Sequence, residues 1–190
     1  GGVFFDWDPN YFYSNIFDTD DERKFFLSEV CNEAWNIKQD AGRTIIEAES
    51  ELITQFPKYE QEIKMYYKNH RKMIRGTFEL SIKALENLKK LNYECYVLSN
   101  WSAETFVGMV DDYPFLHKFD GLLISGEDKL MKPDSAIYEL AIERFNLVPE
   151  ETVFIDDKLE NINAAKELNL SIIHLTDPNI IESEINNFLI

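Results

Sequence analysis

The clearest fold signal in this chain is YECYVLSNW, at residues 93–101. Its middle is short, apolar and rich in aromatic and β-branched side chains, which predicts a buried strand. The strand stops at a hydroxyl and an amide, two small groups that can donate hydrogen bonds to an anion. Because ligands bind outside the carboxyl ends of the strands in open α/β sheets, Ser99 and Asn100 are expected to face a site. The alternative is that Ser99 only caps a helix beginning near Ser102.

The chain after Gly76 alternates between helical and strand patterns, as in proteins that form a parallel sheet. Strands are expected at residues 93–98, 119–124, 152–155 and 171–175, and helices at residues 78–88, 102–110, 136–145, 161–168 and 180–189. Val3 to Phe5 read as a further strand or an extended connector, which Pro9 ends.

Residues 11–75 have a helical pattern almost throughout. Thr44 and Glu47 form a capping-box signature at the start of one helix, which Pro57 ends. Residues 35–42 are expected to be a connection between helices, and His70 an interior side chain. The predicted fold class is therefore α/β: a Rossmann-like parallel-sheet core of residues 1–10 and 76–190, with an all-helical insert of residues 11–75.

Charge and composition narrow the partners. The 190 residues carry a formal net charge of −16, which argues against nucleic acid or an anionic membrane, although a cation and a lysine can still recruit a phosphorylated small molecule. The two cysteines, Cys31 and Cys95, are typical of a reduced, cytoplasmic protein. No apolar run approaches membrane-spanning length.

Two further stretches carry chemistry. The apolar strand at 152–155 ends in Asp156 and Asp157, and neighbouring carboxylates of this kind suit Mg²⁺, although a solvated turn would also explain them. Lys132 precedes Pro133 and Asp134 at a helix start, where its charge is expected to point toward an anion. No packing role is evident for Lys132, so its removal is expected to leave stability nearly unchanged.

These stretches together resemble a known family. Leu98 to Asn100, Lys132 to Asp134, and Phe154 to Asp157 with Asn161 resemble motifs two, three and four of the haloacid dehalogenase superfamily. The beginning of the chain and residues 35–43 resemble its phosphatase-like branch with a small helical cap, which is related to the N-terminal phosphatase domain of epoxide hydrolase.

The resemblance implies a Mg²⁺-dependent phosphatase that cleaves a small phosphorylated metabolite through an aspartyl-phosphate intermediate. Such a protein is expected to be a cytoplasmic monomer or homodimer. The implied catalytic residues are Lys132, Ser99 and Asp156; the implied phosphate-binding residues are Ser99, Asn100 and Lys132; the implied metal ligands are Asp157, Asp156 and the backbone carbonyl of Gly1, with Asn161 supporting the site.

The nucleophile is the point at which this chain departs from the pattern. The branch reads apolar run, Asp, any residue, Gly-Gly-Val, so the resemblance places the nucleophilic aspartate two positions before Gly1. Gly1 itself would stand where many relatives carry an acid–base aspartate. The rival register makes Asp6 the nucleophile and Asp8 the acid–base group, because an apolar run also precedes Asp6.

Two other functions stay open: a non-catalytic relative that binds phosphate or a partner, and a haloacid dehalogenase-type hydrolase. The substrate is expected to be selected by the helical cap, and four of its residues are candidates for facing the pocket: Trp35, Gln39, Asp40 and Arg43.

Overall fold

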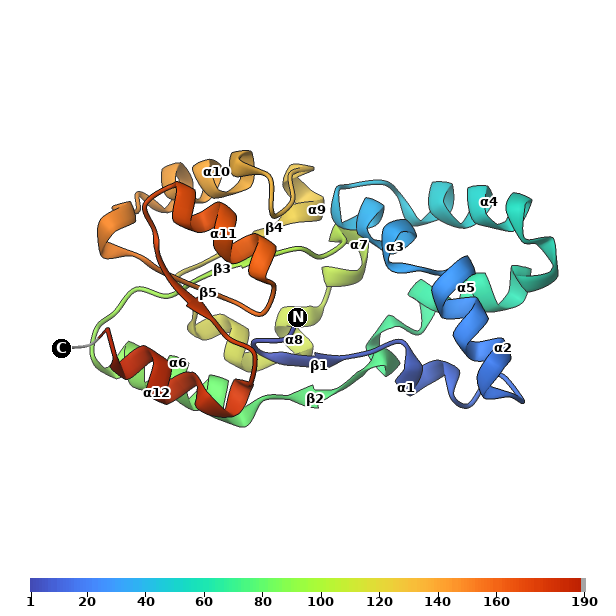
Figure 1. Ribbon diagram of the computed structural model, residues 1–190, viewed down its shortest axis with the longest axis horizontal. Coiled ribbons are helices and arrows are strands. Elements are labelled where there is room, and N and C mark those ends of the chain that lie inside the picture. The colour runs from blue at the N-terminus through green and yellow to red at the C-terminus, as the bar shows by residue number, and fades with distance from the viewer. Residues whose placement is uncertain (189–190) are drawn as a thin grey trace.

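A block of short helices makes up most of the chain before residue 74 (Figure 1). The computed structural model describes residues 1–188. A π-helical turn and a 3-10 turn lie between α-helices of the block, and a second 3-10 turn leads from the last helix to the strand that follows. The α-helices are α1 (Asn10–Tyr13), α2 (Asp20–Phe25), α3 (Glu33–Asp40), α4 (Ile45–Gln55) and α5 (Glu60–Lys68).

Helix α4 shows how the local sequence specifies this block. The Glu47 main-chain N–H donates to Thr44 Oγ1 at 3.3 Å, and the Thr44 main-chain N–H donates to the Glu47 carboxylate at 3.2 Å. This capping box, predicted from the sequence, satisfies donors that the first turn of a helix leaves without partners. The helix ends at Gln55, just before Pro57, and it buries Ala48 and Leu52 on its inner face.

The interior of the block is mainly aromatic. Tyr13, Phe26 and Tyr66 are almost completely buried, and the rings of Trp35 and Tyr66 meet edge to face with their centroids 5.3 Å apart. Aromatic side chains bury large apolar areas and prefer such tilted contacts. The helices before residue 74 therefore have a hydrophobic core of their own.

The expected connection at residues 35–42 is wrong, because α3 occupies most of it. Asn32 caps this helix by accepting a hydrogen bond from the Trp35 main-chain N–H at 2.8 Å. Trp35 and Gln39 lie one turn apart and are both buried. The apolar periodicity was too weak to predict α3 because a glutamine fills one of its interior positions.

The rest of the chain forms the α/β part, in which three pairs of strands and several helices alternate (Figure 1). Strand β1 (Phe5–Trp7) pairs antiparallel with β2 (Ile74–Thr77), so the chain leaves and re-enters this part side by side. The remaining elements are α6 (Glu79–Lys90), β3 (Tyr96–Ser99), α7 (Ala103–Phe106), α8 (Met109–Asp112), β4 (Gly121–Ile124), α9 (Ser125–Asp128), α10 (Ser135–Phe145), β5 (Val153–Asp156), α11 (Leu159–Glu167), β6 (Ser171–His174) and α12 (Ile181–Asn186).

The parallel strands predicted after Gly76 are present, in two separate pairs. Strand β3 runs parallel to β4, and β5 runs parallel to β6. Within residues 1–188 no hydrogen-bonded ladder joins one pair to the other. The α/β fold class is therefore confirmed, with the sheet divided between β3 and β5.

An apolar cavity of about 580 Å³ lies where the two pairs face each other. Tyr96 and Leu98 of β3 line it together with Phe154 and Ile155 of β5, and helices α6, α10 and α12 contribute further apolar side chains. Native interiors rarely contain empty apolar space of this size. The cavity is wide enough to hold several side chains between the two pairs of strands.

Two predicted helices differ in detail. The expected helix at 102–110 is two short helices, α7 and α8, because Gly108 adopts a left-handed conformation with φ of +78° between them. The expected last helix at 180–189 is α12, which is preceded by a 3-10 turn. Its expected end at Leu189 lies outside the described residues.

Candidate active site

Two of the predicted polar groups meet although 24 residues separate them in sequence. Lys132, before α10, directs its Nζ to Asp156 Oδ2 at 2.6 Å, at the carboxyl end of β5. Both side chains are buried, with 8% and 6% of their surfaces exposed. Burying two charges is favourable only when they pair closely and hydrogen bonds satisfy their other polar atoms.

Lys132 is held from several sides. Its Nζ also donates to the Leu98 carbonyl at 2.8 Å. The Asn100 side chain clamps its backbone: Lys132 N donates to Asn100 Oδ1 at 2.9 Å, and Asn100 Nδ2 donates to the Lys132 carbonyl at 2.9 Å. The Lys132–Pro133 peptide is cis. The expectation that Lys132 has no packing role is therefore wrong, since it joins the ends of β3 and β5.

Asp156 is surrounded by donors. Besides Lys132, the Lys158 main-chain N–H donates to its Oδ1 at 2.8 Å and Asn161 Nδ2 donates at 2.9 Å. Burial by itself raises the pKa of Asp156, but the charge of Lys132 and these hydrogen bonds outweigh it, so the pKa lies below its ordinary value. Asp156 is therefore an ionised carboxylate that positions the lysine.

Asp157, the second member of the pair, is exposed and lies against Gly2. A Cβ atom on Gly2 would come within 2.7 Å of the Asp157 carboxylate, so a larger residue at position 2 would displace this carboxylate. The Gly1 carbonyl accepts hydrogen bonds from Phe4 N and Phe5 N at 3.2 Å each. The beginning of the chain thus lies beside the end of β5.

The oxygen atoms gathered here are of the type that Mg²⁺ binds. Asp157 offers an exposed carboxylate, and a second oxygen is the carbonyl of Gly1, the residue before Gly2, which lies against Asp157. Among residues 1–188 there is no group of three or more His, Cys, Asp or Glu side chains that could hold a metal. Mg²⁺ commonly takes only one or two carboxylates and completes its shell with water and phosphate, so the donor set fits this ion.

Ser99 ends β3, where it lies opposite Ile124 in the register with β4, and it is half-buried. Its sheet edge is the one at which Asn100 and Lys132 meet. Asn161 is buried at 4% exposure, and its Oδ1 has no hydrogen-bond partner among the described residues. The structure therefore gathers the sequence-predicted residues of three motifs at one edge of the α/β part.

The rival register based on Asp6 and Asp8 is not supported by their contacts. The Asp6 carboxylate accepts from Tyr11 Oη at 2.6 Å and pairs with the Arg75 guanidinium at 2.6 Å. Asp8 Oδ1 caps the following turn by accepting from Asn10 N at 2.8 Å. Neither carboxylate contacts the Lys132–Asp156 pair within the part of the chain that is described.

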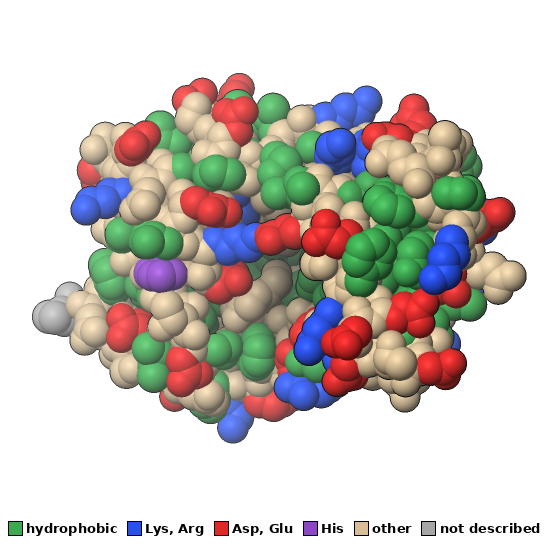
Figure 2. Space-filling view, turned by 45° about the vertical axis from the view of Figure 1, so that its right-hand side comes forward, with side chains coloured by type: hydrophobic (Ala, Val, Ile, Leu, Met, Phe, Trp, Pro, Cys, Tyr) green, Lys and Arg blue, Asp and Glu red, His purple; other side chains and the backbone are tan. Residues whose placement is uncertain are grey.

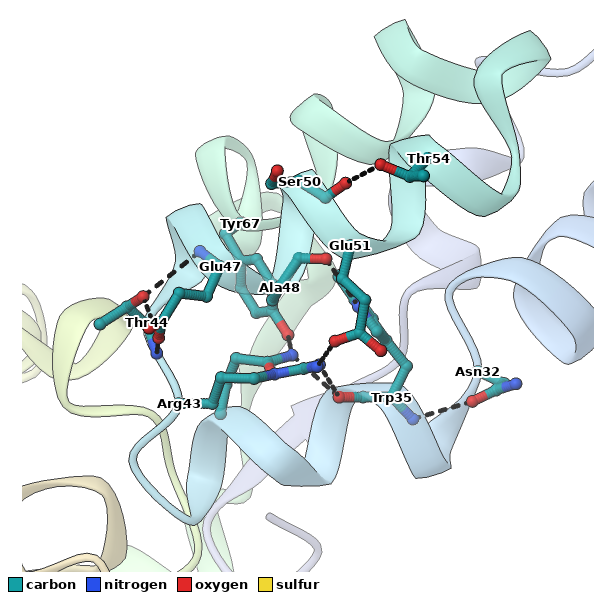
Figure 3. A network of polar contacts seen from close by, with 11 residues as sticks. Asn32, Trp35, Arg43, Thr44, Glu47, Ala48, Ser50, Glu51, Thr54 and Tyr67 are labelled. Carbon is teal, nitrogen blue, oxygen red and sulfur yellow. Dashed lines mark hydrogen bonds and ion pairs between the residues drawn. The ribbon is translucent and has the colours of Figure 1, made fainter.

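Of the four candidate pocket residues of the helical block, three make their hydrogen bonds inside it. Trp35 Nε1 donates to the Ala48 carbonyl at 3.2 Å, and Arg43 pairs with Glu51 and the Trp35 carbonyl (Figure 3). Gln39 is completely buried and donates to Tyr67 Oη. Asp40 is the exception, because its contacts lie across the boundary with the α/β part.

Two residues near the boundary between the helical block and the α/β part were not predicted from the sequence. Ser125 is completely buried at the end of β4, where its Oγ accepts from Trp101 N at 2.9 Å and donates to the Asp40 carbonyl at 2.6 Å. Lys158, directly after the aspartate pair, forms an ion pair with Glu33 of α3 at 2.6 Å. Figure 2 shows a hollow between the two parts of the molecule, with acidic and basic side chains along its rim. Of these two residues, only Ser125 had a signal in the sequence, namely its position directly after a predicted strand.

Comparison with known proteins gives consistent matches. Residues 15–175 match the family model described as haloacid dehalogenase-like hydrolase. A sesquiterpene phosphatase of Aspergillus oryzae is 27% identical over 177 residues, which cover 93% of this chain and 87% of that protein. A phosphorylated carbohydrates phosphatase of Thermotoga maritima is 27% identical over 125 residues, covering 66% of this chain and 48% of that protein.

Solved structures share the fold. An Asp-to-Ala variant of an enzyme of this family from Bacteroides thetaiotaomicron, in complex with magnesium and inorganic phosphate, superposes with a TM-score of 0.70. The two sequences are 23% identical, and the match covers 91% of this chain and 89% of that one. No helix in residues 1–188 has both the length and the apolar character needed to cross a membrane.

Proposed function

The chain belongs to the haloacid dehalogenase-like hydrolases, and from that premise we propose that it is a Mg²⁺-dependent phosphatase of a small phosphorylated metabolite. The observation that carries the proposal is the buried Lys132–Asp156 pair, clamped by Asn100 at the edge where β3 and β5 end. A fixed cation at this place is suited to the charge that develops on a transferring phosphoryl group. The names of the two phosphatase relatives support the same chemistry.

Each polar group has a proposed role. Ser99 and Asn100 bind phosphoryl oxygens, and Lys132 stabilises the charge on the phosphoryl group while Asp156 and Asn161 hold it in place. Asp157 would hold Mg²⁺, with the Gly1 carbonyl and Asp156 beside it, and the ion would supply charge neutralisation of the phosphate when bound. The clamp on Lys132 fixes the position of its charge before substrate arrives.

The nucleophile is proposed to be an aspartate upstream of Gly1, at the end of an apolar strand. The cavity between β3 and β5 is lined by apolar side chains from both, which suits such a strand. The charges of Asp157, Lys132, Asp156 and Asp40 all act on the amino nitrogen of Gly1, so a carboxylate just before Gly1 would lie among them. That position would bring the carboxylate near Lys132, the residue proposed to hold the phosphoryl group.

We further propose that residues 11–75 are the cap that selects the substrate, and that residues 1–10 and 76–190 form the core. The hollow between the two parts in Figure 2 would then receive the metabolite. Both cysteines are free, and Cys31 is buried, which supports a cytoplasmic location. A monomer or homodimer suffices, since the proposed groups all come from one chain.

The experiment compares two proteins: the chain that begins at Gly1, and the same chain extended by its own upstream segment. Only the extended protein is expected to hydrolyse p-nitrophenyl phosphate in the presence of Mg²⁺, and to melt at a higher temperature because the strand fills the cavity. Replacing the upstream aspartate by asparagine in the extended protein is the matched control and should abolish turnover.

Three results would contradict the proposal. Turnover by the chain from Gly1 that Asp6→Asn abolishes would establish the rival register. Turnover of a 2-haloacid that persists in chelator would establish the dehalogenase alternative. An extended protein that binds phosphate without hydrolysing any ester would establish the non-catalytic alternative.

A further inference from the structure

Asp40 stands at the end of α3 with both its backbone and its side chain tied to the α/β part. Its carbonyl accepts the Ser125 hydroxyl at 2.6 Å, at the end of β4. Its carboxylate accepts a hydrogen bond from the Ser102 main-chain N–H, in the loop that follows β3. Asp40 is therefore positioned by the two loops that extend from the edge bearing Ser99 and Asn100.

Charged groups from three elements face this carboxyl group. Lys158, at the start of α11, and the amino group of Gly1 act on it from the α/β part. Ser125, which binds the Asp40 main chain, directly follows Ile124, and Ile124 lies opposite Ser99 in the β3–β4 register, so Asp40 lies at the edge of the sheet that bears Ser99. Glu33, two turns away at the other end of α3, pairs with Lys158 at 2.6 Å.

The protonation state of Asp40 differs from that of its neighbours. Burial raises the pKa of Asp40 to about 7, and the positive charges of Gly1 and Lys158 and the Ser102 hydrogen bond only partly oppose the rise. Residues upstream of Gly1 would remove the positive charge of its amino group, and this would raise the pKa of Asp40 further. Asp156 is held ionised by Lys132, so it cannot serve as a proton donor.

Cleavage of an alkyl phosphate needs such a donor. When the P–O bond to the alcohol breaks, the leaving oxygen takes both electrons and becomes a strongly basic alkoxide unless it receives a proton. General acids placed within hydrogen-bond reach typically accelerate such steps about 10²–10⁴-fold, and they work best when their pKa lies near the working pH. Asp40 is half-buried, so part of its surface is exposed and open to a bound substrate.

We propose that Asp40 is the general acid–base of this enzyme, supplied by the helical block instead of the sheet. The inference rests on the proposed phosphatase function. As the P–O bond to the alcohol breaks, Asp40 gives its proton to the leaving oxygen, and the alcohol departs while phosphorus remains bound to the nucleophilic aspartate. Asp40 then takes a proton from water, whose oxygen attacks phosphorus; the bond to the aspartate breaks and inorganic phosphate is released.

Two substrates with different leaving groups test this role in the extended protein. Nitrophenolate leaves without a proton, whereas a simple alkoxide does not. Asp40→Asn should therefore lower kcat for an alkyl phosphate by about 10²–10³-fold. It should spare the first step on p-nitrophenyl phosphate, so that a burst of nitrophenolate precedes a slow steady state.

The pH profile gives a second readout. With the alkyl phosphate, kcat of the unaltered extended protein should fall as the pH rises above about 7, because Asp40, whose pKa is raised further once the Gly1 amino charge is gone, loses its proton. Asp40→Asn should remove this limb. Glu33→Gln, on the same helix, breaks the ion pair with Lys158 but keeps the carboxyl of Asp40, and it should change both substrates in the same proportion.

Equal losses in the rate of the first step on the two substrates, so that no nitrophenolate burst is seen, or an unchanged pH profile in Asp40→Asn, would overturn the role of Asp40 while leaving the phosphatase function standing. An unaltered extended protein that hydrolyses neither substrate would overturn both proposals together.

Discussion

Removing the charge of Lys132 should destabilise this protein strongly, even without substrate. In Lys132→Met the aliphatic part of the side chain remains, but Asp156 loses the cation at 2.6 Å. The Lys158 and Asn161 hydrogen bonds to its Oδ1 remain. The Asp156 side chain, 6% exposed, cannot gain much hydration in exchange. Breaking a buried ion pair by removing one partner costs about 3–5 kcal/mol.

The loss should depend on pH in a defined direction. In the unaltered protein the pKa of Asp156 is lowered, so its contribution to stability is complete above the ordinary aspartate value and is lost as the pH falls through the lowered value. In Lys132→Met burial acts without the cation and raises the pKa, so the buried carboxylate is most unfavourable at neutral pH. The destabilisation should therefore be largest near pH 7 and smaller near about pH 4, where aspartate approaches its ordinary titration range.

Urea denaturation followed by circular dichroism measures this difference at the two pH values. Lys64→Met is the control, since the Lys64–Glu60 pair has the same type of contact with side chains 55% and 51% exposed, and little change is expected. The double variant Lys132→Met, Asp156→Leu should be more stable than Lys132→Met alone. A loss below about 1 kcal/mol, or an equal loss at both pH values, would refute the role of burial in this pair.

Two glycine substitutions give further predictions. Gly2→Ala places a Cβ within 2.7 Å of the Asp157 carboxylate, so in the extended protein it should raise the Mg²⁺ concentration needed for half-maximal activity. Gly76→Ala, whose Cβ would have no atom within 4 Å, should not, and equal effects in an activity titration would argue against Asp157 as a ligand. Gly126→Ala places a Cβ 2.4 Å from Ala103 N and should lower the free energy of unfolding by about 1–3 kcal/mol. Gly76→Ala has no atom within 4 Å of its Cβ and should change the free energy of unfolding little. Similar unfolding curves for the two variants would contradict the close packing of α9 on the segment from Trp101 to Ala103.

Local sequence was sufficient for the elements whose signals lie within a few residues. The Thr44–Glu47 capping box and the stop at Pro57 fix both ends of α4, because helix termini are decided by nearby side chains. Strands β3 and β5 were found for a similar reason, since each is a short apolar run that ends in polar residues. Helix α3 was missed because its buried side can be recognised only from what packs on it.

The sequence by itself determined which chemical groups are available: the hydroxyl and amide after β3, the lysine before Pro133 and the paired carboxylates after β5. Only the tertiary structure decided their states. Lys132 is buried and not solvated because β5 brings Asp156 to it across 24 residues of chain. Asp40 differs from the other three candidates of the helical block because Ser102 and Ser125 of the α/β part bind it. Burial and charge pairing are sums over neighbours that are distant in sequence, so no local pattern contains them.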